Sequence, residues 1–588
     1  MSADSTRPLP TGAELLEKGR ALAKTWKVEP GPFLKHRNVA SEAEFKRQRA
    51  AERAITQHAQ IGFRDHARSC EAYREIYERC LAKDVTVDRY GITLDWSMGY
   101  TKATRTTDLQ GTGLMLEGPE DFVKLTHSAP VAPHFGDFIM GFPAAVENTQ
   151  AALAAGSTSM GNLGQLYTFR LPGDPDGIAA VEASVIALGL VAAQPVEVLV
   201  HSNLDDGFAG LFTDMSSTMG MVFLEKYIVE ELIGAHLSYC YGHHFSDPLR
   251  RHAFLKALGR VSKSPGTMVY GNTTSYRGND AQNYASLASY LTVDIFGQRI
   301  CPTGHAINPV PVTENSRIPD IDEIVDAQLF AGRLAERSLG LETMIDPEES
   351  DRIADLIIEG GKRFKENALK GLAEDGVDTT DPFRMFLAIK RLGAKKVEER
   401  FGAGAIEPEM PRGRRPVVAG SLMEEIHHMS VKHMAKVTPA SKTKLAQAGV
   451  RVLTATTDVH EHAKLLIDNM FKDLGVTVVD GGVSVDPIDI AKQLKSVEVD
   501  AIALTTYNGV ALSYYQSLKQ TLADHGFNIP VLIGGRLNQV PQGSNTSLPV
   551  DVTKELAAAG AVVCLEVEDA VPALIAAKAQ KPKDAALQ

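Results

Sequence analysis

Apolar and polar positions fall into two alternating patterns over residues 61–345. Short apolar runs of strand length are followed by longer runs in which apolar residues recur at helical spacing. The clearest strand-like runs are VTVDRYGITLD, PVEVLVHSN, AHLSYCYGHH, GTMVYGNT and LTVDIFG. Strands that alternate with helices predict a parallel sheet, which is either a (β/α)8 barrel or an open doubly wound fold.

The ends of these strand-like runs favour the barrel. They carry polar and aromatic residues in groups: His201 and Asn203, then Tyr239, Tyr241, His243 and His244, then Tyr270, Asn272 and Thr273. Barrel active sites are assembled from the C-terminal ends of several strands, and a barrel has about 250 residues, which fits this segment. We therefore expect a TIM-type (β/α)8 barrel that binds substrate, although each of these residues alone is equally consistent with an ordinary loop.

Residues 446–588 have a sharper pattern, in which strand-like and helix-like runs alternate five times. The strands are VRVLTATT, VTVVDGG, VDAIALTT, IPVLIGG and GAVVCLE, and Asp486-Pro487 is a strong start signal for one of the helices. This pattern predicts a doubly wound α/β domain of flavodoxin-like size. Residues 346–445 predict a helical connector between the two α/β regions, and residues 1–60 predict a helical N-terminal arm.

Composition narrows the class of protein. A chain of 588 residues is too long for one core and predicts about two to four domains. The formal net charge of −12 argues against nucleic acid or an anionic membrane surface as a partner. The longest apolar stretch, residues 178–200, is interrupted by charged residues and a proline, so we expect no membrane span. No secretory signal is visible, and five scattered cysteines fit a reducing, cytoplasmic compartment.

Candidate ligand-binding residues cluster where the strands of the last domain end, and ligands of open α/β sheets bind at such ends. These residues are Asp458 and His460 after the first strand, Thr505, Thr506 and Gly509 after the third, and Gly534 and Gly535 after the fourth. The glycines would let a bulky group approach the backbone, and the threonine hydroxyls can hydrogen-bond a buried group. His460 can bind a metal through one ring nitrogen while Asp458 holds the other.

One histidine with no other strong ligand nearby cannot hold a free metal ion, so the metal must arrive with its other ligands attached. A corrinoid does this, and the segment resembles the cobalamin-binding domain of the base-off, His-on family. The family pattern is Asp-x-His-x-x-Gly, then Ser-x-Leu, then Gly-Gly; here it reads Asp458-Val-His460-Glu-His-Ala463, Thr505-Thr-Tyr507 and Gly534-Gly535. Ala463 replaces a glycine and Thr505 replaces a serine. The resemblance implies that these residues bind adenosylcobalamin, with His460 as the axial ligand to cobalt.

Other histidines near this motif have simpler interpretations. His462 is interpreted as a solvated residue at the start of a helix. His427, His428 and His433 are interpreted as a surface or packing face, because no cysteine or carboxylate framework accompanies them.

Residues 61–345 resemble, more loosely, the large component of glutamate mutase. The matching runs are GAHLSYCYGHHFSDPLRRHAFLKAL, GTMVYGNTTSYRGNDAQ and ENSRIPDIDEIVDAQ, and ALAAGSTSMGNLGQLYTF matches the region that contacts glutamate. Where that enzyme holds the substrate's ammonium group with a glutamate, this chain has Gly161-Asn162, and Cys301 and His305 stand where it grips the adenosyl ribose. These departures favour a dicarboxylic acid without an amino group, as in 2-methyleneglutarate mutase, a relative that carries both domains on one chain.

The resemblance implies a radical conversion of 2-methyleneglutarate to 3-methylitaconate, which strictly requires no general acid or base. Arginine is the favoured clamp for a carboxylate, because its planar fork donates two hydrogen bonds. Arg89 matches an arginine of the glutamate mutase carboxylate site, whereas Arg170 and Arg277 are chosen only because they lie in turns after apparent strands. We predict Arg89, Tyr167, Tyr241 and His305 as residues of the substrate site.

Other functions remain open from the sequence. A mutase of the same family acting on glutamate or another branched acid would carry the same motifs, and so would a corrinoid-dependent methyltransferase. Against methyl transfer, there is no cysteine cluster that would hold zinc to activate a thiol acceptor. A corrinoid carrier or light sensor would not need the barrel, and no lysine for the pyridoxal phosphate of an aminomutase can be singled out. The N-terminal arm favours a homodimer or homotetramer.

Overall fold

The computed structural model describes residues 8–106, 111–169, 171, 174, 176–205, 208–242, 245, 247–271, 273–276, 278–314, 316–457, 462–507, 509–541 and 548–580. The chain separates between Ser421 and Leu422 into two units, called unit 1 and unit 2 in chain order. Unit 1 therefore contains the N-terminal helices, the first α/β region and most of the segment predicted as a connector.

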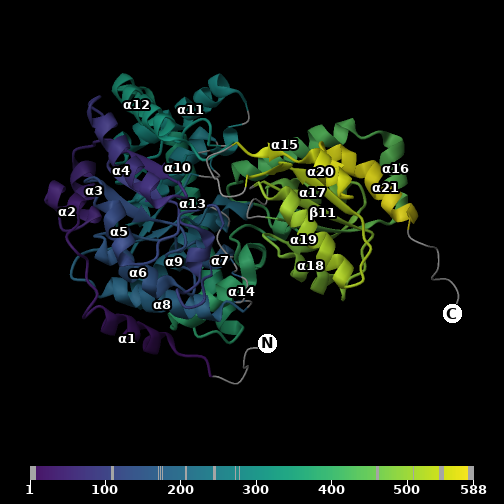
Figure 1. The fold of residues 1–588 in the computed structure, drawn as a ribbon, viewed down its shortest axis with the longest axis horizontal. Coiled ribbons are helices and arrows are strands. Elements are labelled where there is room, and N and C mark those ends of the chain that lie inside the picture. The colour runs from purple at the N-terminus through teal and green to yellow at the C-terminus, as the bar shows by residue number, and fades with distance from the viewer. Residues whose placement is uncertain are drawn as a thin grey trace. The chain divides into compact units, whose positions relative to one another are not determined.

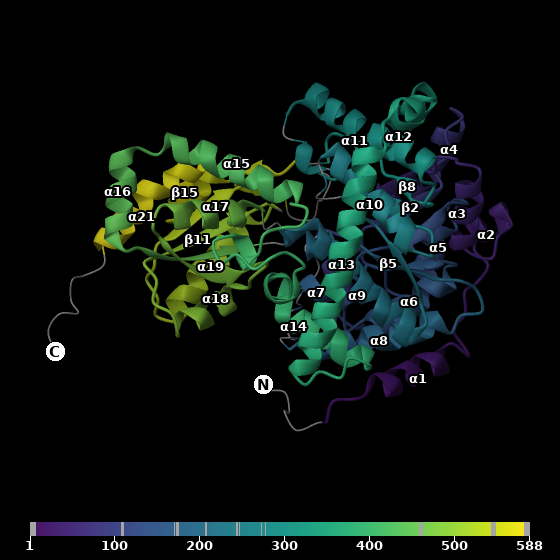
Figure 2. The same ribbon diagram turned by 180° about the vertical axis from the view of Figure 1, so that it is seen from behind.

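The centre of unit 1 is a parallel sheet of six strands, which are flanked by helices (Figure 2). The strands follow the chain in order: β1 (His58–Ile61), β2 (Arg89–Ile92), β3 (Ala132–Phe135), β4 (Ser159–Met160), β5 (Leu199–Ser202) and β6 (His236–Tyr239). A second, two-stranded parallel sheet consists of β7 (Met268–Val269) and β8 (Ala306–Ile307). Single parallel bridges join Tyr241 to Val269 and Gln57 to Ile307.

The prediction of a TIM-type barrel is not confirmed, because the six-stranded sheet is not closed. β7 and β8 have two residues each, so they are too short to form continuous ladders with both neighbours, and only single bridges reach the larger sheet. One predicted strand is wrong: LTVDIFG lies inside helix α11 (Asp280–Ile300). No glycine or proline separates this run from the helical residues before it, so the helix continues through it.

Helices connect the strands of unit 1 and follow them. They are α4 (His66–Leu81), α5 (Pro119–Thr126), α6 (Ala145–Ala154), α7 (Gln165–Thr168), α8 (Ile178–Ala192), α9 (Met215–Lys226), α10 (Pro248–Val261), α11, α12 (Ile321–Arg337), α13 (Glu348–Glu374) and α14 (Pro382–Phe401). The π-helix η4 (Tyr227–Ile233) continues α9. The long helix α13 lies against α9 and α10, so the segment after residue 345 packs on the α/β region of unit 1 (Figure 2).

Three helices precede the first strand: α1 (Gly12–Leu22), α2 (Pro32–Arg37) and α3 (Glu42–Ala51). Thr11 begins α1, where its hydroxyl accepts from the backbone N–H of Glu14 and the Glu14 carboxylate accepts from that of Thr11. α1 packs on α8, and two glycines let the helix backbones approach closely. A Cβ on Gly189 would lie 2.9 Å from the carbonyl oxygen of Leu16, and one on Gly19 would overlap that of Ile186.

Unit 2 is a five-stranded parallel sheet with helices on both faces (Figure 1). Its strand order is β10 (Thr477–Gly482), β9 (Arg451–Thr456), β11 (Ala501–Thr506), β12 (Val531–Gly535) and β15 (Val562–Cys564). The helices are α15 (Ser421–Lys436), α16 (Pro439–Ala448), α17 (His462–Asp473), α18 (Pro487–Leu494), α19 (Ala511–Asp524), α20 (Thr553–Ala558) and α21 (Ala570–Gln580). A short antiparallel pair, β13 (Asn538–Gln539) and β14 (Val550–Asp551), follows β12. This strand order confirms the predicted flavodoxin-like domain.

Each face of the unit 2 sheet has its own apolar core, because successive side chains of a strand point to opposite faces. Leu453, Ile502 and Leu504 pack on one face with Ile490 of α18 and Leu518 of α19. On the other face, Val452 and Ala503 pack with residues of α17 and α21, among them Phe471 and Leu574. Both faces are therefore buried, which explains the nearly continuous apolar runs of the strands.

No helix among the described residues has the length and apolar character needed to cross a lipid bilayer.

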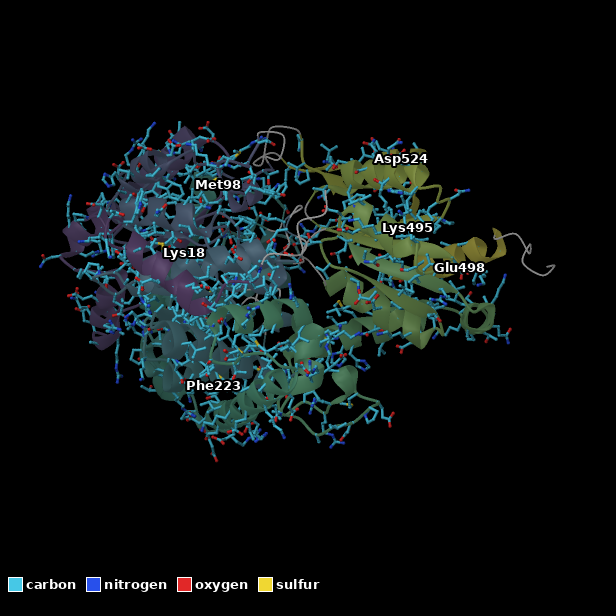
Figure 3. The ribbon with its side chains drawn as sticks, turned by 90° about the horizontal axis from the view of Figure 1, so that it is seen from below. Lys18, Met98, Phe223, Lys495, Glu498 and Asp524 are labelled. Atoms are coloured by element: carbon cyan, nitrogen blue, oxygen red, sulfur yellow. The ribbon has the colours of Figure 1, made fainter. Side chains whose placement is uncertain are left out.

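We expect Gly19→Ala to lower the melting temperature by roughly 3 °C, although alanine favours a helix by about 1 kcal/mol. The added Cβ would overlap the Ile186 carbonyl oxygen, so α1 has to move away from α8. Thermal unfolding measures the change, with Lys18→Ala, an exposed position of the same helix, as the control (Figure 3). An unchanged or higher melting temperature would show that α1 does not need the close approach.

Candidate functional site

The C-terminal ends of β9, β11 and β12 lie at one edge of the unit 2 sheet. β10 lies on one side of β9 and β11 on the other, and such a change in strand order opens a crevice in doubly wound sheets. Thr505 is in register with Gly534, and Thr506 is in register with Gly535. The structure thus brings together four of the residues predicted to bind the cofactor.

The two threonines at the end of β11 are buried without hydrogen-bond partners. Thr505 and Thr506 are each 4% exposed, and neither hydroxyl oxygen has a partner among the described residues. An unpaired buried hydroxyl costs about 1–3 kcal/mol, so such groups are rare unless a ligand or water satisfies them. Their position at the crevice indicates that a ligand does so.

Two glycines beside them are required by the protein's own backbone. Gly535 has a φ of +97°, and a Cβ there would overlap the carbonyl oxygen of Thr506. A Cβ on Gly534 would lie 3.1 Å from the carbonyl oxygen of Cys564. Gly509 has a φ of +71° and accepts a hydrogen bond from the backbone N–H of Val540 at 2.8 Å. The close carbonyl oxygens and the positive φ angles account for glycine at these positions, which also present no side chain to a ligand.

Asp458 and His460 lie outside the described residues. Ala463 is the second residue of α17 and is half-buried. Next to it, the Lys464 ammonium group is buried and contacts the carboxylates of Asp468 and Asp480 at 2.9 Å each. Burial alone would lower the pKa of Lys464, but the two carboxylates raise it above its usual value. These ion pairs fasten the start of α17 to β10.

Tyr507 directly follows the two threonines, and Arg536 directly follows the two glycines. No role for Arg536 was predicted from the sequence. The Arg536 guanidinium lies over the Tyr507 ring, 4.3 Å from its centroid. The backbone N–H of Arg536 also donates to the carbonyl oxygen of Thr506 at 2.8 Å. A cation–π contact thus joins the two loops beside the crevice.

Comparison with known proteins agrees with this geometry. Residues 449–575 match the protein family described as B12 binding domain. Unit 2 contains a B12-binding domain. A crystal structure of a cobalamin-binding protein from Desulfitobacterium hafniense DCB-2 is 18% identical, with 26% of this chain and 81% of that chain covered and a TM-score of 0.18, which is too low to carry an argument. A comparison with curated proteins found no match.

The residues of the B12-binding domain fit the tail of a corrinoid. The tail carries a phosphate, a ribose and a base, which need hydrogen-bond partners and a close approach to the backbone. The unpartnered hydroxyls of Thr505 and Thr506 supply the first, and Gly534 and Gly535 have no side chain that would block the second. Cobalamin binding thus has support both from the family match and from the side chains themselves.

One group of metal-ligand side chains in unit 2, formed by His433, Glu566 and Glu568, is part of an ion-pair network. His433 Nδ1 lies 2.8 Å from Glu568 Oε2, and Lys436 Nζ lies 2.7 Å from Glu568 Oε1 and 3.4 Å from Glu566 Oε2. Burial would raise the pKa of Glu568, but hydrogen bonds from Lys436 and His433 lower it to about 2. The ammonium group of Lys436 already provides a counter-charge to the carboxylates of Glu566 and Glu568. His427 and His428 are exposed, as predicted for a surface face.

In unit 1, Arg89 is buried at the start of β2, with 1% of its surface exposed. Its Nε donates to Glu42 Oε1 at 2.8 Å, and its two terminal nitrogens contact His58 Nδ1 at 3.1 Å and Ser159 Oγ at 3.2 Å. The side of the sheet on which these contacts lie is called the Arg89 face. A substrate carboxylate could bind Arg89 only by replacing one of these partners, and the clamp role stays a prediction.

Glu42 belongs to α3, which holds a second buried charge. Lys46 Nζ donates to the carbonyl oxygens of Thr267 and Gly304 at 2.7 and 3.0 Å and lies 3.6 Å from Glu42 Oε1. Burial lowers the pKa of Lys46 to about 8. The N-terminal helices thus supply both the counter-charge of Arg89 and a link to the residues before β7 and β8. Sequence reasoning missed this role, because the partners lie far apart in the chain.

Three buried histidines share the Arg89 face: His58, His134 and His201. Burial and the nearby guanidinium lower the pKa of each well below its usual value, so all three are neutral at pH 7. The ring centroids of His134 and His201 are 4.4 Å apart. His134 Nδ1 lies 3.3 Å from the carbonyl oxygen of Ser159 and 3.2 Å from its Oγ, and the tautomer decides whether the other ring nitrogen, Nε2, donates or accepts. That Nε2 has no partner in the described part of the chain. The feature of the sequence that could have drawn attention to His134 is its place within an apolar strand.

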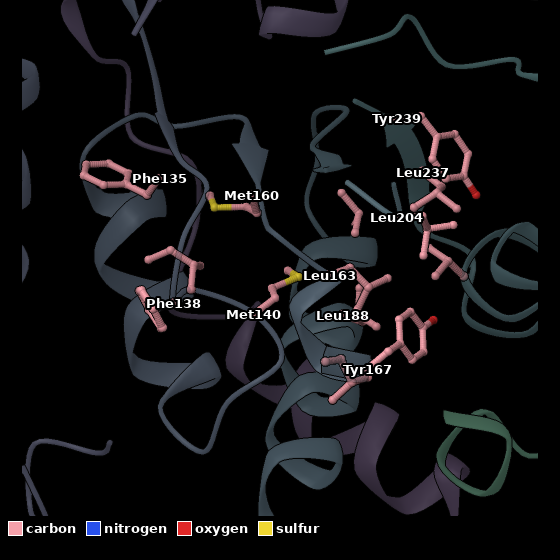
Figure 4. Packing of buried hydrophobic residues seen from close by; sticks show 14 of the residues in the cluster. Phe135, Phe138, Met140, Met160, Leu163, Tyr167, Leu188, Leu204, Leu237 and Tyr239 are labelled. Carbon is pink, nitrogen blue, oxygen red and sulfur yellow. The ribbon is translucent and has the colours of Figure 1, made fainter. Parts of the chain in front are cut away.

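Tyr167 contacts a buried carboxylate in the core of unit 1. Its hydroxyl donates to Glu225 Oε1 at 3.2 Å, and Ser202 Oγ donates to the same oxygen at 3.1 Å. The Tyr167 ring packs on that of Phe208, with the centroids 5.1 Å apart, and its apolar surroundings are seen in Figure 4. Burial raises the pKa of Glu225 to about 7. Glu225, from α9, was missed because its partners come from α7 and β5.

Tyr241 and His305 are brought together, with ring centroids 5.3 Å apart. His305 Nδ1 contacts Thr303 Oγ1 at 2.6 Å, and burial lowers its pKa to about 3. His305, Thr303 and Cys301 line a cavity of about 230 Å³ with Tyr239. Arg89, Tyr167 and His305 have different immediate hydrogen-bond partners. The alternative arginines, Arg170 and Arg277, and the strand-end residues His243, His244 and Asn272 lie outside the described residues.

A buried ion pair links the loops after β6 and β7. Arg251 of α10 donates to both carboxylate oxygens of Asp294 in α11, at 2.6 and 2.8 Å. It also donates to the carbonyl oxygens of Gly242 and Tyr270 at 2.7 Å each. Asp205, after β5, accepts from the backbone N–H of Gly242 at 2.7 Å. Three loops at the C-terminal ends of strands are thus positioned by one network, which sequence reasoning missed.

We expect Asp294→Asn to lower the free energy of unfolding by about 3–5 kcal/mol, because it leaves the Arg251 charge buried without a counter-charge. Urea unfolding followed by fluorescence measures the loss. The control is Glu349→Gln, which breaks an exposed ion pair with Arg352 and should cost less than about 1 kcal/mol. Equal effects of the two variants would contradict the positioning role of Asp294.

Glu225→Gln should change how stability depends on pH. Glu225 binds its proton more tightly in the folded protein than in the unfolded chain, so folding loses stability as pH rises from about 4.5 to about 7. The loss reaches about 1.4 kcal/mol per pH unit in that interval. Glu398, whose pKa is also raised to about 7, titrates in the same interval, so the informative quantity is the difference between the variant and the unmodified protein. Parallel curves from urea unfolding at pH 4.5 to 7.5 would contradict the assignment.

Proposed function

We propose that the protein is an adenosylcobalamin-dependent mutase that rearranges the carbon skeleton of a small dicarboxylic acid, 2-methyleneglutarate to 3-methylitaconate. The observation that carries the cofactor part is the pair of unpartnered hydroxyls, Thr505 and Thr506, inside the matched B12-binding domain. The reaction and the substrate are supported by the resemblance of residues 61–345 to the large component of glutamate mutase and by its departures from that pattern.

The cofactor would be held by residues on three strand ends. His460 would supply the ligand to cobalt, and the carboxylate of Asp458 would orient the His460 ring. Thr505 and Thr506 would hydrogen-bond the tail. Ala463, Gly509, Gly534 and Gly535 would line its path along the backbone. When bound, adenosylcobalamin supplies an adenosyl radical by homolysis of its cobalt–carbon bond.

The substrate would be held by unit 1, whose task is to fix two carboxylates and exclude water. We propose that the eight strands act as a (β/α)8 barrel, which the single bridges at Tyr241–Val269 and Gln57–Ile307 support. Arg89 would then contact a carboxylate by exchanging one of its present partners. Tyr167, Tyr241 and His305 would form walls of the site, and the Arg251–Asp294 network would hold the loops at its mouth.

Methyl transfer is the second candidate, because a B12-binding domain serves that chemistry equally well. A thiol acceptor would call for a zinc site with cysteine ligands. All five cysteines are free, and the three-membered group of metal-ligand side chains found among the described residues contains none of them. This distribution favours the mutase. A mutase acting on glutamate or another branched acid remains the nearest alternative within the same class.

The substrate is tested by electron paramagnetic resonance of the protein loaded with adenosylcobalamin, before and after 2-methyleneglutarate is added. We expect a coupled cobalt and organic radical signal with 2-methyleneglutarate and none with glutamate. Silence with both acids despite bound cofactor would reject the proposed substrate, and a signal with glutamate alone would move the assignment to that acid. Turnover with methylcobalamin and a thiol acceptor would support methyl transfer instead.

His460→Ala should remove the axial nitrogen ligand. In the Co(II) form of the cofactor bound to protein labelled with ¹⁵N-histidine, the unmodified protein should show a two-line nitrogen splitting, and His460→Ala should lose this ¹⁵N splitting even where the cofactor's own dimethylbenzimidazole takes the vacant position. His462→Ala, two residues further along, is the matched control and should leave the splitting intact. Asp458→Ala should weaken cofactor binding by about 10- to 100-fold, because it removes the orienting carboxylate. An unchanged splitting in His460→Ala would contradict the assignment of the axial ligand.

A further inference from the structure

Thr454, in the middle of β9, shares a sheet face with Thr505. Thr454 is in register with Ala503, and Thr456 is in register with Thr505. Residues two apart on a strand point to the same face, so Thr454, Thr456 and Thr505 form one row, called the threonine strip. Val452 and Ala503 on this face share a core with Phe471 of α17, so the strip lies between the sheet and that helix.

The threonine strip is polar where the opposite face is apolar. Thr454 is fully buried, and its hydroxyl, like that of Thr505, has no hydrogen-bond partner among the described residues. The Thr456 hydroxyl accepts from the backbone N–H of Ser484 at 2.8 Å and is therefore satisfied. Valine has nearly the same shape as threonine and would fill these positions without an unpaired hydroxyl. Two unpaired hydroxyls in one row indicate a ligand with polar groups along its length.

The neighbours of the strip differ on its two sides. Toward β11 and β12, Ala503 lies beside Thr454 and Gly534 lies beside Thr505, so little side chain stands there, whereas toward β10 the larger Asp480 is in register with Thr454. A planar ring that enters from the strand ends would therefore lie over Ala503 and Gly534, away from Asp480. Thr454 is the deeper of the two positions, because it lies two residues, about 7 Å, below the end of β9.

We propose that the threonine strip receives the lower base of the corrinoid and selects one with a hydrogen-bonding outer edge. The proposal rests on the cofactor binding proposed above. The base is the last group of the tail, so its outer edge meets the deepest hydroxyl, that of Thr454. Adenine presents an amino group and a ring nitrogen at this edge, whereas 5,6-dimethylbenzimidazole presents two methyl groups. The adenine form satisfies the Thr454 hydroxyl, and cobalamin itself, with dimethylbenzimidazole, leaves it unpaired.

The test is an absorbance titration of the full-length protein with three corrinoids: cobalamin, its analogue with adenine as lower base, and cobinamide, which has no base. We expect the adenine form to bind about 5- to 150-fold more tightly than cobalamin, which is the effect of satisfying one buried hydroxyl. Thr454→Val should bring the adenine form to the level of cobalamin and leave cobinamide unchanged. Thr454→Ser, which keeps the hydroxyl, should retain the preference.

Thr477→Val is the matched control, because Thr477 is an exposed threonine at the start of β10, and it should change none of the three affinities. Thermal unfolding shows whether Thr454→Val is folded, and Thr454→Ser keeps the test valid if it is not. Equal affinities for the two nucleotide forms, tighter binding of cobalamin, or equal losses of both in Thr454→Val would overturn the selectivity while leaving cofactor binding in place. Failure of all three corrinoids to bind would overturn the cofactor proposal together with it.

Discussion

A buried guanidinium constrains much of unit 1. Arg89 cannot remain charged inside the protein without a partner, because an isolated buried charge costs far more than a single contact returns. Its counter-charge, Glu42, comes from a helix that precedes the first strand. The histidines around it stay neutral for the same reason, since a further positive charge there would have no partner. Through Glu42 and Lys46, helix α3 thus reaches into the interior of unit 1.

Buried polar groups are arranged differently on the Arg89 face of unit 1 and at the strand ends of unit 2. On the Arg89 face of unit 1, charges and hydroxyls are largely paired with one another, and the network is a rigid core that holds loops and strands in place. In unit 2, the hydroxyls of Thr454, Thr505 and Thr506 are buried and left open at the point where a doubly wound sheet binds its ligand. The first arrangement stabilises the fold by itself. The second becomes favourable only when something binds.

Sequence reasoning succeeded where the determining contacts are local or follow a fixed topology. The five strands of unit 2 were predicted because each is an apolar run with its own turn signals, and Thr505 and Gly534 were expected at neighbouring positions because strand ends of such sheets meet. It failed where partners are distant in the chain. Glu42 and Arg89 are 47 residues apart, and Arg251 and Asp294 are 43 residues apart. A closed barrel was predicted but is not confirmed, because strand periodicity gives no sign that β7 and β8 are only two residues long.

The contact between Lys46 and the carbonyl oxygens of Thr267 and Gly304 has a consequence for how the chain is made. On the ribosome, the helix that carries Lys46 emerges first, but its partners follow more than two hundred residues later. At a synthesis rate of about 5–20 residues per second, α3 waits roughly ten seconds or longer for them. During that interval it carries a lysine and a glutamate whose burial is not yet possible. Helix α3 can therefore take its final place in unit 1 only after the residues around β7 and β8 have left the ribosome.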